Sequence, residues 1–173
     1  MKFVITVPHA TCPANADDET HNCDTLAKEF ANSLKKEITC AGVEVYVGDV
    51  PRTACDLNRK ECRNLAFRKQ VAKAIKKDTI VLDAHSYPVK GNDYSPFEVF
   101  LIGNTELRGK IGDRLEKAGY KVGQKDSPPV NDILEQSREI GSDAVLVEVN
   151  ESLKTGRLKD ISREIAGVLC EMS

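Results

Sequence analysis

The chain is poor in the residues that mark several common classes of protein. Among its 173 residues there is no tryptophan, aromatic residues make up 5%, and histidine occurs three times. No apolar run approaches the roughly 20 residues that a membrane-spanning helix needs. Neither sign of charge is in excess, since 25 basic residues stand against 27 acidic ones. We therefore expect neither a membrane nor a nucleic acid as a partner.

The sequence also shows no signal-peptide core and no closely spaced cysteine pair. Because Met1 and Lys2 lead directly into a strand-like run, we expect a cytoplasmic location. Six cysteines are present without a CxxC pair, and a chain of this length can bury a core without cross-links. The pattern favours reduced, partly buried thiols. Cys12 and Cys23 follow His9 closely and are weaker candidates for zinc ligands than the nearby carboxylates.

Apolar runs of strand length alternate with segments of helical periodicity along the whole chain. This alternation is typical of a sheet whose strands are joined by crossover helices. No internal repeat or linker divides the sequence, so we predict a single α/β domain over residues 1–173, with a mixed, mostly parallel sheet flanked by helices. Gly141 is placed to end a helix. The predicted strands are 2–7, 43–48, 79–84, 97–102, 120–123 and 144–149, and the predicted helices are 24–38, 61–77, 105–118, 130–140 and 157–171.

Two of the three histidines stand just past the ends of predicted strands. His9 follows the apolar run of residues 3–7, and His85 follows the run of residues 80–82. In an open α/β sheet, the carboxyl ends of parallel strands form the edge at which ligands bind. We therefore predict that the two imidazoles converge on one metal ion, rather than serving as hydrogen-bonded histidines at strand ends.

A catalytic zinc ion typically has three protein ligands, so this site needs one more. Asp24 is our choice, because it opens the first predicted helix and the loop after His9 can bring it alongside. An Asp at the start of a helix is equally well explained as an N-cap. Asp18, Glu19 and His21, in the same loop, are alternatives for the third ligand.

The segment of residues 51–59 places two arginines and an amide in one loop. Guanidinium groups form bidentate pairs with carboxylates, so Arg59 together with Asn58 could hold an acidic group of a substrate. Arg52, if it lies near a metal, could stabilise an oxyanion. The alternative is a solvated loop in which Asp56 pairs with one of the arginines, and the segment taken alone favours this second interpretation.

Glu148 is a charged residue inside the last apolar strand. A carboxylate in the run of residues 145–149 is costly unless it is paired or functional. It stands near the carboxyl end of the strand, the edge that also presents the two histidines. A carboxylate at a metal site is a common general base for hydrolysis, and we favour this role over a structural ion pair with an arginine such as Arg59.

Several fragments, in this order along the chain, are similar to those of one known family. They are Val7-Pro8-His9-Ala10, Asp24-Thr25-Leu26-Ala27, Arg52 with Asp56-Leu57-Asn58-Arg59, Asp83-Ala84-His85-Ser86, and Val147-Glu148-Val149-Asn150. Together they resemble the N-formylglutamate amidohydrolase family, which is related in fold to the zinc carboxypeptidases. The resemblance implies a zinc hydrolase of phosphorylase/hydrolase-like α/β fold that cleaves an amide next to a free carboxylate.

The resemblance also implies a role for each matching residue. The metal ligands would be His9, Asp24 and His85. Glu148 would be the base that activates water, and Arg52 would face the developing oxyanion. The carboxylate of the substrate would be held by Asn58 and Arg59.

We accordingly predict a zinc-dependent amide hydrolase that acts on an N-acyl amino acid or on the end of a peptide. Its partner would be a small-molecule or peptide substrate that bears a carboxylate. Two alternatives are a metal-binding protein of the same fold without catalysis and a hydrolase whose nucleophile is Cys55 or Cys12.

Overall fold

The computed structural model describes residues 1–13, 23–89, 94, 96–103, 105–126 and 131–173. Strands and helices alternate along the chain, as the hydrophobic pattern predicted. In the described part of the chain no helix has the length and apolar character needed to cross a membrane. The elements are β1 (Lys2–Val7), α1 (Ala27–Glu37), β2 (Gly42–Val47), a 3-10 turn (Lys60–Cys62), α2 (Ala66–Ala74), β3 (Thr79–Tyr87), β4 (Val99–Ile102), α3 (Glu106–Lys117), β5 (Val122–Lys125), α4 (Asp132–Ile140), β6 (Asp143–Asn150) and α5 (Thr155–Glu171).

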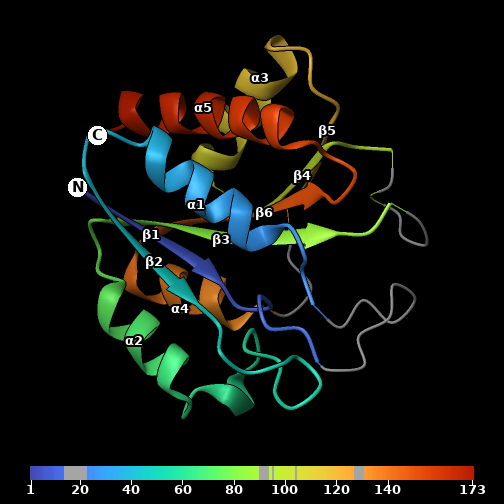
Figure 1. Cartoon of the computed structure of the whole chain (residues 1–173). Helices are drawn as coiled ribbons and strands as arrows, with labels where there is room; N and C mark the ends of the chain where they lie inside the picture. Colours follow the sequence, from blue (N-terminus) through green and yellow to red (C-terminus); the bar gives the residue numbers. More distant parts are fainter. Residues whose placement is uncertain (14–22, 90–93, 95, 104, 127–130) are drawn as a thin grey trace.

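The strands form one sheet in the order β2-β1-β3-β6-β4-β5. Only the pairing of β4 with β6 is antiparallel, and the other neighbours are parallel. Helices α1, α3 and α5 cover one face of the sheet, and α2 and α4 cover the other (Figure 1). The predicted fold class, a mixed and mostly parallel sheet between helices, is confirmed.

The inner strands are apolar on both sides, because helices cover both faces of the sheet. Along β1, Phe3 and Ile5 pack toward α1, α3 and α5, whereas Val4 packs toward α2 and α4. The same alternation holds in β3, where Leu82 belongs to the first core and Val81 to the second. Side chains two residues apart in a strand share a face, so the polar residues that follow Val81 at steps of two also face α2 and α4.

Strand β3 is longer than the sequence predicted, and this changes the position of His85. We expected the strand to end at residue 84, but it continues to Tyr87 because β6 continues beside it as far as Asn150. His85 therefore lies within the strand, held by backbone pairing on its β6 side. The expected helix end at Gly141 is confirmed, since this residue is the C-cap of α4 with a φ of 78°.

The helix predicted over residues 24–38 begins later, at Ala27, and the helix predicted over 61–77 begins at Ala66. Residues 25 and 26 form a turn before α1, and the segment before α2 begins with the 3-10 turn Lys60–Cys62. Asp24, which belongs to the site described below, directly precedes the first of these turns.

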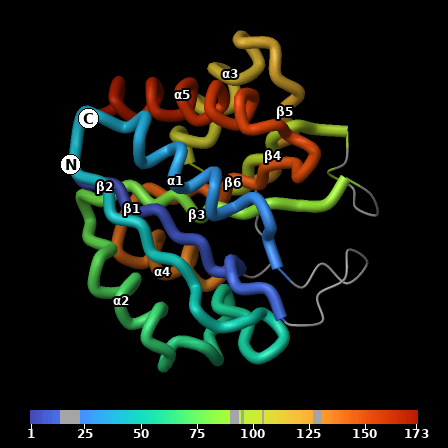
Figure 2. The backbone as a smooth tube through the Cα atoms, viewed as in Figure 1, coloured from blue at the N-terminus to red at the C-terminus, as the bar shows by residue number. Residues whose placement is uncertain are grey.

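All six cysteines are paired, so the expectation of reduced thiols was wrong. The disulfides join Cys12 to Cys23, Cys40 to Cys170 and Cys55 to Cys62. The pairing of Cys40 with Cys170 could not be recognised from local sequence patterns, because 130 residues separate them. They meet because α1 packs against α5, which places the end of one helix beside the end of the other (Figure 2).

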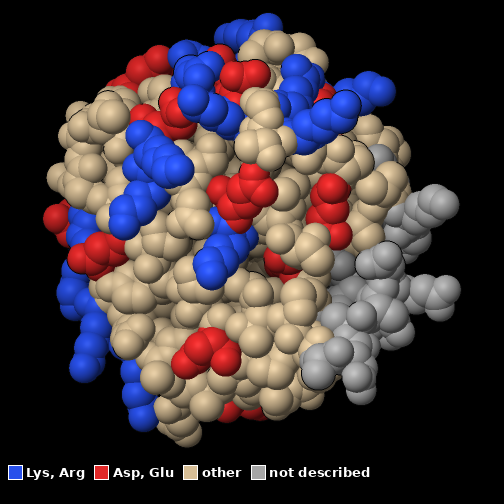
Figure 3. Space-filling model, in the orientation of Figure 1, with Lys and Arg blue, Asp and Glu red and all other residues tan. Residues whose placement is uncertain are grey.

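Both chain termini lie at the end of the molecule away from the carboxyl ends of β1 and β3 (Figure 2). On the face shown in Figure 3, basic and acidic side chains are interspersed. This distribution agrees with the near balance of charge in the sequence, which has a formal net charge of −2.

The disulfide between Cys40 and Cys170 should contribute strongly to stability. Replacing both residues with alanine is expected to lower the free energy of unfolding by roughly 2–4 kcal/mol, because the cross-link restricts a long loop of the unfolded chain. Urea denaturation without reductant measures this loss. With a dithiol reductant present, the variant and the unmutated protein should unfold at similar urea concentrations. A difference that persists under reducing conditions would contradict the pairing.

Candidate metal centre

Two histidines and one aspartate meet at the carboxyl edge of the sheet. His9, Asp24 and His85 are all buried, and one potential ligand atom from each lies within 4.8 Å of the others. Nδ1 of His85 is 2.7 Å from Oδ2 of Asp24, and Nδ1 of His9 is 3.6 Å from the same oxygen. The two imidazole rings have centroids 4.9 Å apart. The convergence predicted from strand ends is therefore present in the structure.

Each of the three residues comes from a different segment of the fold. His9 lies just after β1, and His85 lies within β3, which is paired with β1. Asp24 precedes α1, and its backbone N–H donates to the carbonyl oxygen of His9 over 2.9 Å. This bond holds Asp24 next to His9, while the pairing of β3 in the sheet determines the position of His85.

The alternatives for the third ligand, Asp18, Glu19 and His21, lie outside the described residues. Cys12 and Cys23 form a disulfide, so their sulfur atoms are not available as thiolate ligands, contrary to the weaker possibility raised from the sequence.

The cluster has the donor atoms that a metal ion requires. Nδ1 of His9 is buried and has no hydrogen-bond partner among the described residues. An orphaned buried nitrogen is costly unless something binds it. Two imidazole nitrogens and a carboxylate oxygen directed at one point form a donor set that suits zinc, and it also suits other ions that accept imidazole. The residues present fit a bound metal ion.

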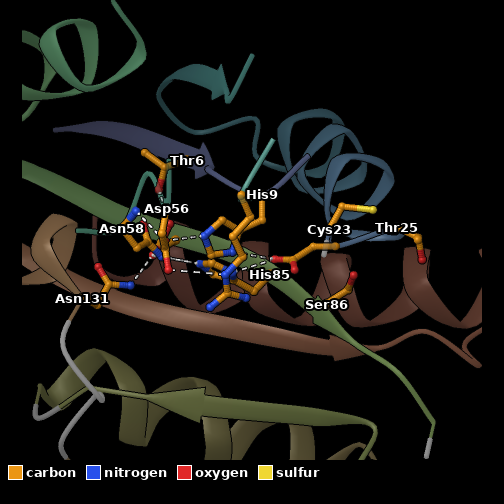
Figure 4. A network of polar contacts seen from close by, with 12 residues as sticks. Thr6, His9, Cys23, Thr25, Asp56, Asn58, His85, Ser86 and Asn131 are labelled. Carbon is orange, nitrogen blue, oxygen red and sulfur yellow. Dashed lines mark hydrogen bonds and ion pairs between the residues drawn. The ribbon is translucent and has the colours of Figure 1, made fainter. Parts of the chain in front are cut away.

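The far nitrogen of each imidazole contacts a second carboxylate. Nε2 of His9 is 2.8 Å from Oδ1 of Asp56, and Nε2 of His85 is 3.1 Å from Oδ2 of Asp83. When Nε2 donates a proton to a carboxylate, Nδ1 carries the free lone pair and is oriented toward a metal. Figure 4 shows Asp56 and Asn58 on one side of the imidazoles, with Cys23 and Thr25 on the other. The arrangement is the one that orients histidine ligands in metal sites.

The sequence did not identify Asp56 and Asp83 in this role. A usable signal existed for Asp83, because a residue two positions before His85 in a strand faces the same side. Asp56 was considered only as a partner for arginines, and its sequence position 47 residues from His9 gives no sign of the contact.

Asp83 is fully buried and receives several hydrogen bonds that keep it ionised. Thr6 donates to its Oδ1 over 2.6 Å, and Asn131 donates to its Oδ2, also over 2.6 Å. Burial alone would raise the pKa of Asp83, but the adjacent His85 and these hydrogen bonds lower it below the ordinary value. The carboxylate is thereby held in the charged form that can orient His85.

Asn58 belongs to this buried layer. We predicted that it would hold the carboxylate of a substrate, and the structure instead directs its Nδ2 inward. This atom donates to Oδ2 of Asp83 over 3.2 Å and lies 3.0 Å from Nε2 of His85. Its side chain is 5% exposed. Asn58 thus lies beside the cluster, and its contact with a substrate stays a prediction.

The charges of the cluster favour a cation at its centre. Burial would raise the pKa of Asp24, but His85 and His9 bring it below the ordinary range. Burial would likewise lower the pKa of His85, yet Asp83 and Asp24 raise it well above the ordinary value. The two carboxylates thus hold a positive charge between them, and a metal ion would supply that charge in place of a proton.

Arg52 and Arg59 lie at the outer side of the cluster, and each is about one-third exposed. Their Nε atoms are both 3.4 Å from Oδ2 of Asp56. Burial would raise the pKa of Asp56, but His9, the N–H of Asn58 and Arg52 lower it below its ordinary range. The alternative interpretation of this loop predicted that Asp56 pairs with an arginine, and such ion pairs are present. Roles in binding substrate or an oxyanion stay predictions.

Glu148 lies directly opposite His85 in the pairing of β3 with β6, so both side chains are on the same face. In the described part of the chain it forms no ion pair, so the structural pairing with Arg59 that we weighed is not seen. The pKa of Glu148 is raised to about 8, chiefly by burial. The negative charges of Asp24 and Asp83 also raise it, whereas the positive charges of His85 and Arg52 lower it. The carboxyl group can therefore take up a proton near neutral pH.

Sequence comparison identifies no relative: no family model matches the chain, and no curated protein does. Comparison with solved structures finds similar folds. The gene product Atu2144 from Agrobacterium tumefaciens has a TM-score of 0.70 at 16% identity, over 99% of this chain and 89% of that one. N-formylglutamate amidohydrolase from Ralstonia eutropha JMP134 has a TM-score of 0.65 at 14% identity, over 98% and 92%.

A third similar structure is the catalytic domain of CwlV, an N-acetylmuramoyl-L-alanine amidase from Bacillus (Paenibacillus) polymyxa var. colistinus. It has a TM-score of 0.63 at 16% identity, over 99% of this chain and 97% of that one. At such low identity these similarities establish the fold alone. The protein is a single α/β domain with a zinc-exopeptidase-like fold, and its buried His-Asp-His cluster could hold a metal ion.

Removing the charge of Asp83 should weaken metal binding. The Asp83→Asn variant is expected to raise the dissociation constant for zinc by roughly 10–100-fold, because the orienting partner of His85 loses its charge. Competition with a chromophoric chelator measures the constant. Asp78→Asn is the matched control, since Asp78 is an exposed aspartate just before the opposite end of β3. Equal affinities for all three proteins would refute the orienting role.

Glu148 should make the metal-free protein less stable as pH rises. Its pKa is about 8 in the folded protein and 4.5 ordinarily, so between these values the folded state binds more protons than the unfolded state. Stability from this group is therefore present at low pH and is lost as pH rises through that window.

The Glu148→Gln substitution should remove the part of the decrease in stability with rising pH that comes from Glu148. In a chelator, the difference in unfolding free energy between the variant and the unmutated protein should shift in favour of the variant from about pH 5 to about pH 8. Urea denaturation at each pH measures the difference. A difference that does not change with pH would show that burial does not affect Glu148 in this way.

Proposed function

We propose that the protein is a zinc-dependent hydrolase of amide bonds, acting on a small N-acyl amino acid or on the end of a peptide. The observation that carries the proposal is the buried cluster of His9, Asp24 and His85, with Glu148 beside it on the same face of the sheet. Two proteins of similar fold, an N-formylglutamate amidohydrolase and an N-acetylmuramoyl-L-alanine amidase, are by name hydrolases of amide bonds. Both support the proposed reaction class.

The proposed mechanism assigns proton transfer to Glu148. Zinc held by His9, Asp24 and His85 would supply Lewis acidity, which polarises a carbonyl group and makes water more acidic. Glu148 takes a proton from the attacking water and then delivers it to the departing amine. Burial raises the pKa of Glu148 in the metal-free protein, and a cation bound nearby would lower it toward the ionised form that accepts the proton.

The second layer of carboxylates maintains the geometry during this reaction. Asp56 and Asp83 hold the two imidazoles in one orientation, so the ligand atoms do not need to rearrange as charge develops.

The proposed substrate bears a carboxylate, because Arg52 and Arg59 present partly exposed guanidinium groups beside the cluster. Within this proposal Arg52 stabilises the oxyanion and Arg59 pairs with the substrate carboxylate. Asn58 contributes less to this pairing than the sequence suggested, because its Nδ2 is engaged with Asp83. Neither a nucleic acid nor a membrane is part of the proposal.

The disulfides bear on two earlier expectations. Cys12 is bonded to Cys23 and Cys55 to Cys62, and a sulfur atom in a disulfide is not a thiolate, which argues against a hydrolase with either cysteine as nucleophile. The cytoplasmic location stays a prediction, and the three disulfides do not favour it, because disulfides are rare in the cytosol.

Replacing the proposed base should separate metal binding from catalysis. The Glu148→Gln variant is expected to keep its zinc while hydrolysis falls by roughly 10²–10⁴-fold, the usual contribution of a general base. Zinc is measured by elemental analysis, and hydrolysis by amine release from N-formyl and N-acetyl amino acids and short peptides. Glu164→Gln is the matched control, since Glu164 pairs with Arg114 on the other face of the sheet.

Three results would overturn parts of this proposal. Undiminished hydrolysis by Glu148→Gln would exclude Glu148 as the base. Zinc in the unmutated protein without hydrolysis of any compound tested would favour the metal-binding protein without catalysis. Hydrolysis that persists after zinc is removed by a chelator would exclude metal dependence.

A further inference from the structure

The backbone that carries Asp24 is held by residues from two other strands. Helix α1 begins at Ala27, and its N-cap residue, Leu26, has no side-chain cap. The first N–H groups of a helix have no partner within the helix and need one elsewhere. Here the N–H of Thr25 donates to Oε1 of Glu151 over 2.9 Å, and the N–H of Leu26 donates to Oγ of Ser86 over 3.1 Å.

Glu151 and Ser86 are also bonded to each other. The Ser86 hydroxyl donates to the same oxygen of Glu151 over 2.7 Å. Ser86 is fully buried in β3, and Glu151 follows the end of β6, where its backbone N–H donates to Tyr87. One carboxylate oxygen therefore accepts hydrogen bonds both from the sheet and from the segment that leads into α1.

Three successive N–H groups are consequently bound by one residue within β3 and by two residues that follow β1 and β6. The N–H of Asp24 donates to His9, just after β1, and the next two N–H groups are bound by Glu151 and Ser86. Figure 4 shows Thr25 and Ser86 together on one side of the imidazoles. These bonds determine where the backbone of Asp24 lies relative to His85, which occupies the strand position next to Ser86.

An aspartate just before a helix usually directs its side chain back to the N–H groups of the first turn. In this protein Oδ2 of Asp24 instead lies 2.7 Å from Nδ1 of His85, while Glu151 and Ser86 bind the N–H groups of the two residues between Asp24 and α1. The negative charge of Glu151 near the start of α1 is also favourable, because the helix dipole is positive there. Residues outside the metal cluster thus hold the short segment between Asp24 and α1.

We propose that Glu151, acting through Ser86 and the N–H of Thr25, is a positioning residue that directs the carboxylate of Asp24 to the metal. The proposal rests on the metal-binding part of the proposed function. It does not depend on which substrate is hydrolysed, so it can be tested by binding alone.

The test compares zinc affinity in chelator-stripped protein, with Glu151→Ala as the main variant. Its dissociation constant, measured by competition with a chromophoric chelator, is expected to rise by roughly 10–100-fold, as for other residues that orient metal ligands. The visible absorption of bound Co²⁺ should also change, because this spectrum reports ligand geometry.

Two further variants distinguish positioning from a general loss of stability. Glu151→Gln retains a carbonyl oxygen that can accept from Thr25 and Ser86, so its zinc affinity should stay within a few-fold of the unmutated protein. Glu164→Ala removes an ion pair between α3 and α5 of similar exposure, so it should lower stability without changing zinc affinity or the Co²⁺ spectrum.

The proposal is overturned if Glu151→Ala binds zinc as tightly as the unmutated protein, or if Glu151→Gln binds it as weakly as Glu151→Ala. If circular dichroism shows that Glu151→Ala does not fold, Ser86→Ala decides, with weaker zinc binding expected and unchanged binding overturning the proposal. A failure of the unmutated protein to bind zinc would refute the proposed function as well, whereas normal binding with unaffected variants would refute the positioning role alone.

Discussion

The parallel pairing of β3 with β1 and β6 is the constraint on which the site depends. It brings His85 opposite Glu148 and places the end of β1, with His9, at the same edge. A shift of one residue in the pairing of β3 would turn His85 to the other face of the sheet and bury it among the apolar residues under α1. The apolar side chains of the inner strands determine this register, because each has a helix-covered core to fill on its own side. The chemistry at the edge is therefore specified by packing far from it.

The cluster is unusual in how much negative charge it buries. Asp24 and Asp83 are both at most 3% exposed, and they lie on either side of the His85 ring. Burying such charges is costly unless they are paired and hydrogen-bonded. The hydrogen-bond donors to Asp83, besides His85, come from β1, from the loop before the 3-10 turn and from the N-cap of α4. A site of this kind is more easily explained by a bound cation than by its contribution to stability.

Much of the fold followed from the sequence, because alternating apolar runs and helical periodicity report directly on strands and helices. The convergence of His9 and His85 also followed, since the carboxyl ends of parallel strands meet at one edge, although His85 lies within β3 and not past its end. The orientation of Asn58 and the contact between Asp56 and His9 could not be predicted. Both depend on irregular backbone before α2, for which hydrophobic periodicity carries no information.

The cysteine pairs illustrate the same limit. Composition and length favoured free thiols, yet pairing depends on which segments the fold brings together. The pair formed by Cys40 and Cys170 follows from the packing of α1 on α5, a tertiary contact that no local pattern contains.

The two short cross-links have a consequence for how the site is assembled. One joins the segment after His9 to the residue before Asp24, and the other closes the loop that contains Asp56, with sequence separations of 11 and 7 residues. Short covalent rings leave few conformations to the chain between their ends. The cross-links therefore hold the backbone beside His9 next to that beside Asp24 and close the ends of the loop of Asp56, so that bringing these residues to a cation would cost less conformational entropy.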